Sequence, residues 1–218
     1  SRILDSLRRQ RRLIESLKHV LHFPDSANLW IGGAAIAAVR RARQKRVSVI
    51  LSSAMPASTH VVGALVSHAT GLPWVADFRD PWIGSRYRSI GRIRGRIEDR
   101  FERMIVNRAT VITAVSPHLA ASLAARHPRA RIEVVENAFD PASWEAIPNE
   151  SPAGFHLCYT GTLYGGQRSP SPFFAAVAAL QAEGDPVAGC VHFHFYGADS
   201  HIAEAEARRY GIAAQVSC

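Results

Sequence analysis

Short apolar runs that favour β-strands alternate with longer helical patterns along this chain, and this alternation restricts the fold more than any other feature of its 218 residues. The runs typical of strands lie at 47–52, 74–78, 110–115 and 131–136, and the helical patterns between them lie at 57–70, 93–107 and 118–126. A strand, a helix and a second strand in this order form a right-handed βαβ unit with parallel strands. The sequence therefore predicts an α/β fold built on parallel sheets.

The alternation stops once and then restarts, which indicates two domains. Residues 140–154 contain three prolines and show little hydrophobic period, so they are interpreted as a linker. Beyond them the strand patterns lie at 155–160, 190–197 and 213–217, again with helical patterns between them. We expect a first domain over 1–139, without its opening strand, and a second domain over 155–218 that is cut short.

The chain carries a net charge of +8, and its basic residues are concentrated before the second domain. Only 3 of the 26 Lys and Arg residues follow residue 150. This asymmetry is typical of a positive face that meets membrane lipid, a phosphate-bearing substrate or nucleic acid, although solvated arginines give the same pattern. A basic helical pattern at 3–21 either lies on anionic lipid or packs on the first domain.

Three scattered cysteines, Cys158, Cys190 and Cys218, do not form a disulfide pattern. The first two lie in apolar strand patterns, where a free cysteine behaves as a small hydrophobic side chain. We therefore expect a reducing, cytoplasmic location. No apolar run approaches the roughly 20 residues of a membrane-spanning helix.

The first strand pattern of the second domain runs into a glycine-rich turn, and a helical pattern follows. Glycines let backbone N–H groups approach an anion closely, and a helix N-terminus adds free N–H donors and the positive end of its dipole. The glycines of this turn, Gly161, Gly165 and Gly166, and the helix start near Ser171 could together bind an anion. The spacing fits neither the dinucleotide fingerprint nor the P-loop, and a turn that needs glycine only for its backbone conformation is the alternative.

Charged residues appear abruptly where the strand at 74–78 ends, in the sequence WVADFRDPW. Open α/β sheets bind their ligands outside the carboxyl ends of the strands. Asp77, Arg79 and Asp80 are therefore candidates to position a substrate or to act on developing charge. The alternative is an Arg–Asp pair that holds the loop, with Trp82 packing against it.

The histidines provide weaker candidates. His192 and His194 point to one face of a strand, as metal ligands would, but no third ligand is evident and we expect no metal site. The histidines at four helical positions are interpreted as surface or capping residues: His60, His68, His118 and His127.

Five motifs in order along the chain carry a family resemblance: DFRDPW, TAVSPHLAASL, VVENAFDP, YTGTLYGG and FHFYGAD. Together they resemble the middle portion of a family 4-like glycosyltransferase, over residues 47–211. Enzymes of that family have the GT-B fold. The resemblance therefore implies an α/β architecture of two Rossmann-like parallel-sheet domains, both incomplete here.

The resemblance places candidate catalytic residues in the first domain. WVADFRDPW is similar to the segment where many family members carry a histidine–aspartate pair near the transferred sugar. Arg79 stands in place of the histidine and Asp80 keeps the acid, so these two are the predicted catalytic residues. Before the linker, Asn137, Phe139 and Asp140 match the family's asparagine–glycine–hydrophobe–aspartate signature, with alanine in place of the glycine.

The resemblance also assigns a donor site to the second domain. Gly161 and Leu163 resemble the glycine–arginine–leucine turn that meets the donor diphosphate, and Thr162 stands where arginine is common. Arg168 lies in the region where a lysine usually follows and would supply a positive charge. Gly161, Thr162 and Arg168 are thus the predicted diphosphate-binding residues. The family's E-x7-E element, which grips the donor sugar and ribose, is expected beyond Cys218.

The function that the resemblance implies is sugar transfer, with retained anomeric configuration, from a nucleoside-diphosphate sugar to an acceptor hydroxyl in glycan, polysaccharide or glycolipid biosynthesis. It implies no metal and no cofactor apart from the nucleotide-sugar donor. The acceptor would be a glycan or a lipid-linked molecule. The protein would make peripheral contact with the inner face of an anionic membrane. No nucleic acid partner is expected. Without the E-x7-E element, the 218-residue chain itself is expected to be inactive.

Two alternatives from other functional classes stay open. A sugar-nucleotide epimerase of similar fold would need carboxylates and histidines in the cleft, in place of an arginine-bearing loop. A noncatalytic α/β module would bind phosphate or nucleic acid through the basic face, although the basic residues of this chain are not interleaved with aromatic ones.

Overall fold

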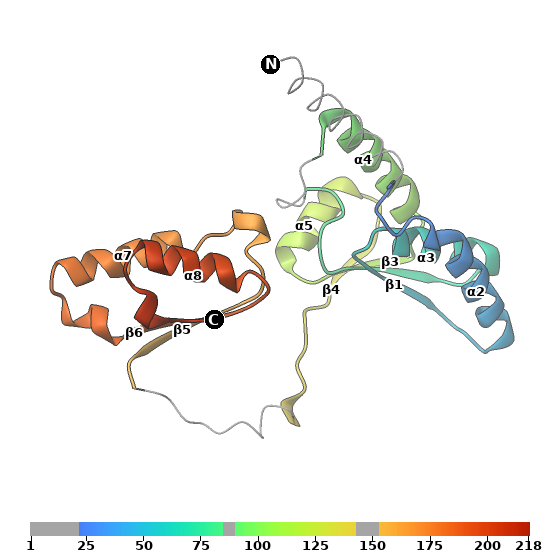
Figure 1. Ribbon diagram of the computed structural model, residues 1–218. Coiled ribbons are helices and arrows are strands. Elements are labelled where there is room, and N and C mark those ends of the chain that lie inside the picture. The colour runs from blue at the N-terminus through green and yellow to red at the C-terminus, as the bar shows by residue number, and fades with distance from the viewer. Residues whose placement is uncertain (1–21, 85–89, 143–152) are drawn as a thin grey trace, which may run out of the picture. The chain divides into compact units, whose positions relative to one another are not determined.

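The computed structural model describes residues 22–84, 90–142 and 153–218 (Figure 1). The chain divides into two compact units, Ser1–Phe139 and Asp140–Cys218, and each is considered by itself. The described strands of both units pair in parallel. The prediction of an α/β fold with two parallel sheets is therefore confirmed. Most of the predicted linker at 140–154 and all of the basic pattern at 3–21 lie outside the described residues, so these two assignments stay predictions.

The first unit contains a four-stranded sheet in which the strands follow their order in the sequence. The strands are β1 (Ile50–Ala54), β2 (Trp74–Phe78), β3 (Val111–Ala114) and β4 (Ile132–Val134). The helices are α2 (Trp30–Gln44), α3 (Ser58–Thr70), α4 (Arg92–Val106) and α5 (Pro117–Arg126). Because α3, α4 and α5 each connect two neighbouring parallel strands, all four strands end at the same edge of the sheet.

Local signals set the ends of the connecting helices. The Ser116 hydroxyl accepts a hydrogen bond from the Leu119 N–H at 3.2 Å, and Pro117 occupies the first turn of α5. These are a preferred helix cap and a residue whose missing N–H costs nothing at that position. Helix α3 ends at Gly71, whose φ of 73° is the left-handed conformation that glycine adopts without strain.

The core of the first unit lies between these helices and the sheet. Trp74, Phe78 and Ile112 from β2 and β3 have no exposed surface. Removing a large apolar side chain from water stabilises the fold by about 2 kcal/mol, so these strands anchor the unit. Helix α3 approaches the sheet closely at Gly63, where an added Cβ would lie 2.5 Å from the Trp74 Nε1 atom.

The first strand differs from the prediction in its position. It begins at Ile50 instead of at 47 and runs on to Ala54. Leu51 is 68% exposed, whereas Ser52 and Ala54 are buried. Exposed and buried residues alternate along β1, so one face of this edge strand is covered and the other is not.

Two of the histidines predicted to be surface or capping residues are buried instead. His60 has no exposed surface, and its Nδ1 is hydrogen-bonded to the Ser52 hydroxyl at 2.8 Å. His127 is 1% exposed and lies between Asn107 Oδ1 at 2.7 Å and Glu102 Oε1 at 3.1 Å. The partners come from other parts of the chain, so helical spacing alone does not reveal them.

Burial of His60 is expected to make the first unit less stable in acid. It lowers the pKa of His60 from 6.5 to about 4, although the charge of Asp77 acts in the opposite direction. Between these two values the unfolded chain takes up a proton that the folded protein excludes, so stability falls as the pH falls. We expect the free energy of unfolding to drop by about 2 kcal/mol between neutral pH and a pH of about 4.5.

Urea unfolding at both pH values measures this drop. In His60→Gln the titrating group is absent, so the variant should lose most of the pH dependence while keeping a polar side chain beside the Ser52 hydroxyl. An equal drop in the variant and in the unmodified chain would show that other groups carry the effect.

The second unit contains a three-stranded sheet in the order β5-β6-β7. The strands are β5 (Phe155–Thr160), β6 (Val191–Tyr196) and β7 (Val216–Ser217), and the helices are α7 (Ser171–Ala182) and α8 (Ser200–Arg209). Among the residues of this unit that the structure describes there are also three short 3-10 helices: η1 (Tyr164–Gly166), η2 (Pro186–Cys190) and η3 (Ala213–Gln215). Figure 1 shows α7 and α8 on one face of the sheet. Val191, Phe193 and Phe195 are buried and alternate with the half-buried His192 and His194.

The cysteines are more exposed than their sequence context suggests. Cys158, Cys190 and Cys218 are all exposed, which contradicts the apolar surroundings expected for the first two. Cys158 alternates along β5 with Leu157 and Tyr159, which pack against the core, so its side chain lies on the opposite face. Within the described residues, none of the helices combines the length and the apolar character needed to span a membrane.

Candidate functional site

A buried carboxylate, Asp77, lies where β2 ends and organises the carboxyl edge of the first sheet. The strand register places Ser53 of β1 on one side of it and Thr113 of β3 on the other. The Ser53 hydroxyl donates to Asp77 Oδ2 at 2.8 Å, and the Thr113 hydroxyl donates to Oδ1 at 2.6 Å. A carboxylate that is 5% exposed is thus held by hydroxyls from both neighbouring strands.

Arg79 connects this carboxylate to the segment that follows β4. Its Nε donates to Asp77 Oδ2 at 2.9 Å. Its Nη1 donates to Asn137 Oδ1 at 2.9 Å and to the Val135 carbonyl at 3.3 Å. Within the described residues the second terminal nitrogen, Nη2, makes no hydrogen bond. The guanidinium therefore sits half-exposed at the sheet edge with its orientation fixed from two sides.

These contacts determine the charge state of Asp77. Burial raises the pKa of this carboxyl, but the hydrogen bonds from Thr113, Ser53 and Arg79 and the charge of Arg79 outweigh it and hold the pKa of Asp77 below its ordinary value. An anionic Asp77 with its oxygens occupied is a weak base. Its chemical role is therefore to position Arg79, whose charge can act on an anion or on a developing negative charge.

The sequence-predicted catalytic pair is only partly brought together. Arg79 belongs to the network, whereas Asp80 is exposed and makes no hydrogen bond within the described residues. The alternative interpretation, in which an Arg–Asp pair holds the loop and Trp82 packs against it, also agrees with the structure. Arg79 pairs with Asp77. Trp82 is 1% exposed and packs edge-on against Phe101, with ring centroids 5.9 Å apart. The pair of Arg79 and Asp77 can hold the loop and position the guanidinium at the same time. The assignment of Arg79 and Asp80 as catalytic residues stays a prediction.

The glycine turn of the second unit is held by a carboxylate that the sequence did not reveal. Asp199, just before α8, accepts from the Thr162 hydroxyl at 2.5 Å and from the Leu163 N–H at 2.7 Å. The hydrogen bonds from Thr162 and Leu163 keep the pKa of Asp199 below its ordinary value. Asp199 thus already occupies donors of the turn.

Gly161 has a backbone role that differs from the one predicted. Its N–H donates to the Tyr196 carbonyl at 2.9 Å, so it is not a free donor for an anion. Its φ of 137° lies in a region that side chains disfavour, which explains the glycine. The neighbouring Thr162 N–H has no acceptor within the described residues and is the donor that remains at this point of the turn.

Arg168 lies next to the turn, as predicted. Its Nη1 donates to the Tyr159 hydroxyl at 3.2 Å, and that hydroxyl donates to the Thr162 carbonyl at 2.9 Å. The guanidinium also lies over the Tyr164 ring, 5.1 Å from its centroid. The structure therefore brings Thr162 and Arg168 together through Tyr159.

The start of α7, the third part of the predicted anion site, faces a carboxylate instead. The Ser171 hydroxyl donates to Glu206 Oε2 at 2.6 Å, and the Ser171 N–H donates to the Ser169 hydroxyl at 3.1 Å. These contacts satisfy the first donor of the helix internally. The positive potential of the turn therefore rests on Arg168 more than on this helix N-terminus.

The strand histidines pair with each other. His194 Nε2 lies 2.7 Å from His156 Nδ1, and the imidazole ring of His156 stacks on that of His192 with centroids 4.7 Å apart. The His156 Nε2 donates to the Ala153 carbonyl at 2.9 Å, so its Nδ1 accepts from His194 in the neutral ring. In the part of the chain that the structure describes, no three His, Cys, Asp or Glu side chains are grouped so as to hold a metal ion.

Comparison with protein families gives a match to the model of Glycosyltransferase Family 4 over residues 3–143. Among solved structures, HepE from Anabaena in complex with UDP and glucose is similar, with a TM-score of 0.57 and 17% identity over 84% of this chain and 50% of that chain. MnaA from S. aureus in a co-structure with UDP is similar with a TM-score of 0.52 and 13% identity, over 88% of this chain and 53% of that chain. The chain spans about half the length of these structures, and the likeness confirms the predicted fold class. No match was found among curated proteins.

Proposed function

This chain belongs to glycosyltransferase family 4, and from that premise we propose that it contributes to the transfer of a sugar from a nucleoside-diphosphate donor to an acceptor hydroxyl. The observation that carries the proposal is the network of Asp77, Arg79 and Asn137 at the carboxyl edge of the first sheet, inside the matched segment. Open α/β sheets bind their ligands at this edge. The UDP held by HepE and by MnaA supports a uridine nucleotide as the donor class.

The reaction also has a stereochemical outcome, an acceptor and a cellular location. We propose retention of the anomeric configuration and a role in glycan, polysaccharide or glycolipid biosynthesis, with a glycan or lipid-linked acceptor. The protein would act at the inner face of an anionic membrane through peripheral contact. The donor would be the only small molecule required besides the acceptor, with no metal and no further cofactor.

We propose separate roles for the two units. In the first, Arg79, oriented by Asp77, stabilises negative charge near the acceptor, and Asp80 supplies an exposed acid. In the second, the departing diphosphate is stabilised by Arg168 and the Thr162 N–H. Asp199 accepts hydrogen bonds from the Thr162 hydroxyl and the Leu163 N–H. A diphosphate at this turn therefore either binds beside the Asp199 carboxylate or displaces it.

Titration calorimetry with UDP, GDP and ADP tests the donor site without requiring turnover. We expect saturable binding of at least one nucleotide, and about tenfold weaker binding by Arg168→Ala because one charge-assisted contact to the diphosphate is lost. Arg208→Ala, an exposed arginine on α8 of the same unit, is the matched control and should bind like the unmodified chain. Equal affinities for Arg168→Ala and the control would remove Arg168 from the site. Absence of binding for all three nucleotides would instead favour the noncatalytic alternative.

A further inference from the structure

Helix α4 presents a row of large apolar side chains to solvent. Ile93, Ile97 and Met104 are 76%, 54% and 52% exposed. Their spacing along the helix places them on one face. Exposing apolar side chains to water is unfavourable, so several of them on one helix face indicate a surface that meets an apolar partner.

Arginines flank this row, and acidic side chains are withdrawn from it. The exposed basic residues of α4 are Arg92, Arg96, Arg100 and Arg103. Glu98 and Glu102 point the other way and are buried, at 0% and 1% exposed. Asp99 is paired with Arg103 and with Arg126, at 3.0 Å and 2.8 Å. The exposed face of α4 is therefore both apolar and strongly positive. We call this face, formed by Arg92, Ile93, Arg96, Ile97, Arg100, Arg103 and Met104, the α4 face.

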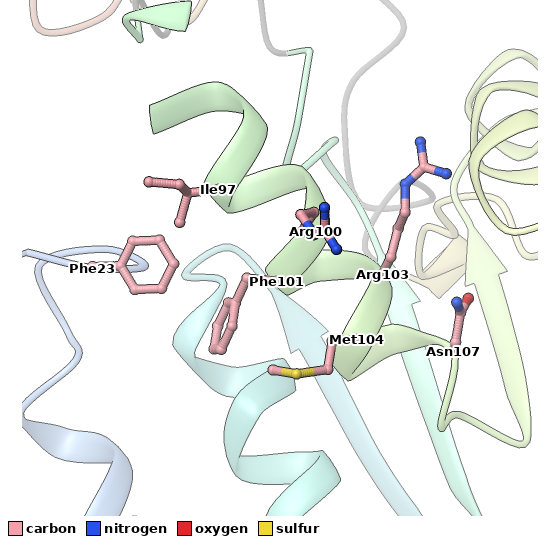
Figure 2. Close-up of a pocket in the computed structure, with 7 residues that line it drawn as sticks. All are labelled: Phe23, Ile97, Arg100, Phe101, Arg103, Met104 and Asn107. Carbon is pink, nitrogen blue, oxygen red and sulfur yellow. The ribbon is translucent and has the colours of Figure 1, made fainter. Parts of the chain in front are cut away.

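A shallow groove of about 780 Å³ runs along the α4 face. Figure 2 shows its lining: Phe23, Ile97, Arg100, Phe101, Arg103, Met104 and Asn107. The rings of Phe23 and Phe101 have centroids 5.0 Å apart and form its apolar floor. Arg100 and Arg103 also line the groove, and a guanidinium can hold a phosphate group while apolar chains contact the two rings.

We propose that the α4 face docks on the surface of a bilayer that contains anionic phospholipid. Amphipathic helices that lie on membranes combine an apolar stripe with flanking Lys or Arg residues in this way. The charges attract anionic headgroups, and the isoleucines and the methionine enter the boundary between headgroups and acyl chains. A nucleic acid fits this face less well, because its most exposed apolar side chains, Ile93, Ile97 and Met104, are not aromatic, and the half-buried rings of Phe23 and Phe101 pack against each other.

The inference specifies the peripheral membrane contact of the proposed function and does not depend on sugar transfer. Vesicle binding is measured without donor or acceptor. If the chain binds vesicles but no nucleotide, the membrane contact of the α4 face is supported and the proposed sugar transfer is not. If it binds a nucleotide but no vesicles, the proposed sugar transfer is supported and the membrane contact is not.

Co-sedimentation with vesicles of equimolar phosphatidylcholine and phosphatidylglycerol tests the proposal. We expect binding that is lost on pure phosphatidylcholine vesicles and that weakens as salt is raised. Arg96→Gln with Arg100→Gln should weaken binding about 30-fold, since each arginine near an anionic surface contributes about a fivefold factor. Ile93→Ser with Ile97→Ser should also weaken it while leaving the charge unchanged.

The matched control is Arg208→Gln with Arg209→Gln, which removes the same charge from exposed positions on α8 in the other unit. Equal binding by this control and by the α4 arginine variant would overturn the proposal, because net charge alone would then explain binding. Equal binding to anionic and neutral vesicles would overturn it as well. Tighter binding of a duplex oligonucleotide than of vesicles, lost in the α4 arginine variant, would assign the face to nucleic acid instead.

Discussion

Replacing Asp77 with alanine is expected to lower the free energy of unfolding of the first unit by about 3 kcal/mol. The substitution removes the acceptor of three hydrogen bonds, from Ser53, Thr113 and Arg79. Arg79 is left beside the sheet edge without its carboxylate, but its side chain is 37% exposed, so water compensates part of the loss. Urea unfolding followed by tryptophan fluorescence measures the change.

Asp80→Ala is the matched control for this prediction. Asp80 is the same residue type three positions further along, exposed and without a hydrogen bond in the described part of the chain. Its replacement should change stability by less than about 0.5 kcal/mol. If the two variants unfold at the same urea concentration, Asp77 does not organise this edge of the sheet. Asp77→Asn adds a separate readout, because it keeps the shape of the side chain but removes its charge and replaces one acceptor oxygen with a donor NH2 group.

Replacing Gly197 with alanine is expected to destabilise the second unit by about 3 kcal/mol or more. An added Cβ would lie 1.7 Å from the Gly161 carbonyl oxygen and 2.9 Å from its carbon, far inside contact distance. Both obstructing atoms belong to the backbone, so no side-chain rotation relieves the clash. The strand ends of β5 and β6 would have to separate, and the Gly161 N–H would lose its bond to the Tyr196 carbonyl.

Gly189→Ala is the control for Gly197→Ala. A Cβ at Gly189 meets no atom within 4 Å, so the same change in composition should leave the unit nearly unaffected. Thermal unfolding followed by circular dichroism compares the two variants, and hydrogen exchange of the β5 and β6 amides assigns any loss to the second unit. Indistinguishable melting curves would mean that the strands do not approach each other this closely at Gly197.

The order and type of the secondary-structure elements could be predicted because their signals are local. The pattern at 74–78 matches β2, and the pattern at 155–160 matches β5, since β-prone residues bounded by turn residues identify a strand without knowledge of its neighbours. The helix expected at 57–70 begins one residue later and ends at the same residue. The family resemblance rests on the same kind of information, which is the order of motifs along the chain.

The candidate sites were only partly predictable, because their hydrogen bonds connect distant parts of the chain. Asp77 carries a signal, since a carboxylate between Ala76 and Phe78 in a buried strand requires partners. The partners themselves follow from strand register, which places Ser53 and Thr113 beside it. Nothing local connects Arg79 with Asn137, 58 residues away.

The sequence by itself determined the alternation of strands and helices, the parallel sheets and the family, because these depend on residues that are close together along the chain. Only the tertiary structure decided which polar groups remain available to a ligand. It assigned the Gly161 N–H to the sheet and placed the Asp199 carboxylate against the turn. It also buried His60. The physical reason is that burial and hydrogen-bond pairing depend on which distant segments meet, and the pattern of neighbouring residues does not contain that information.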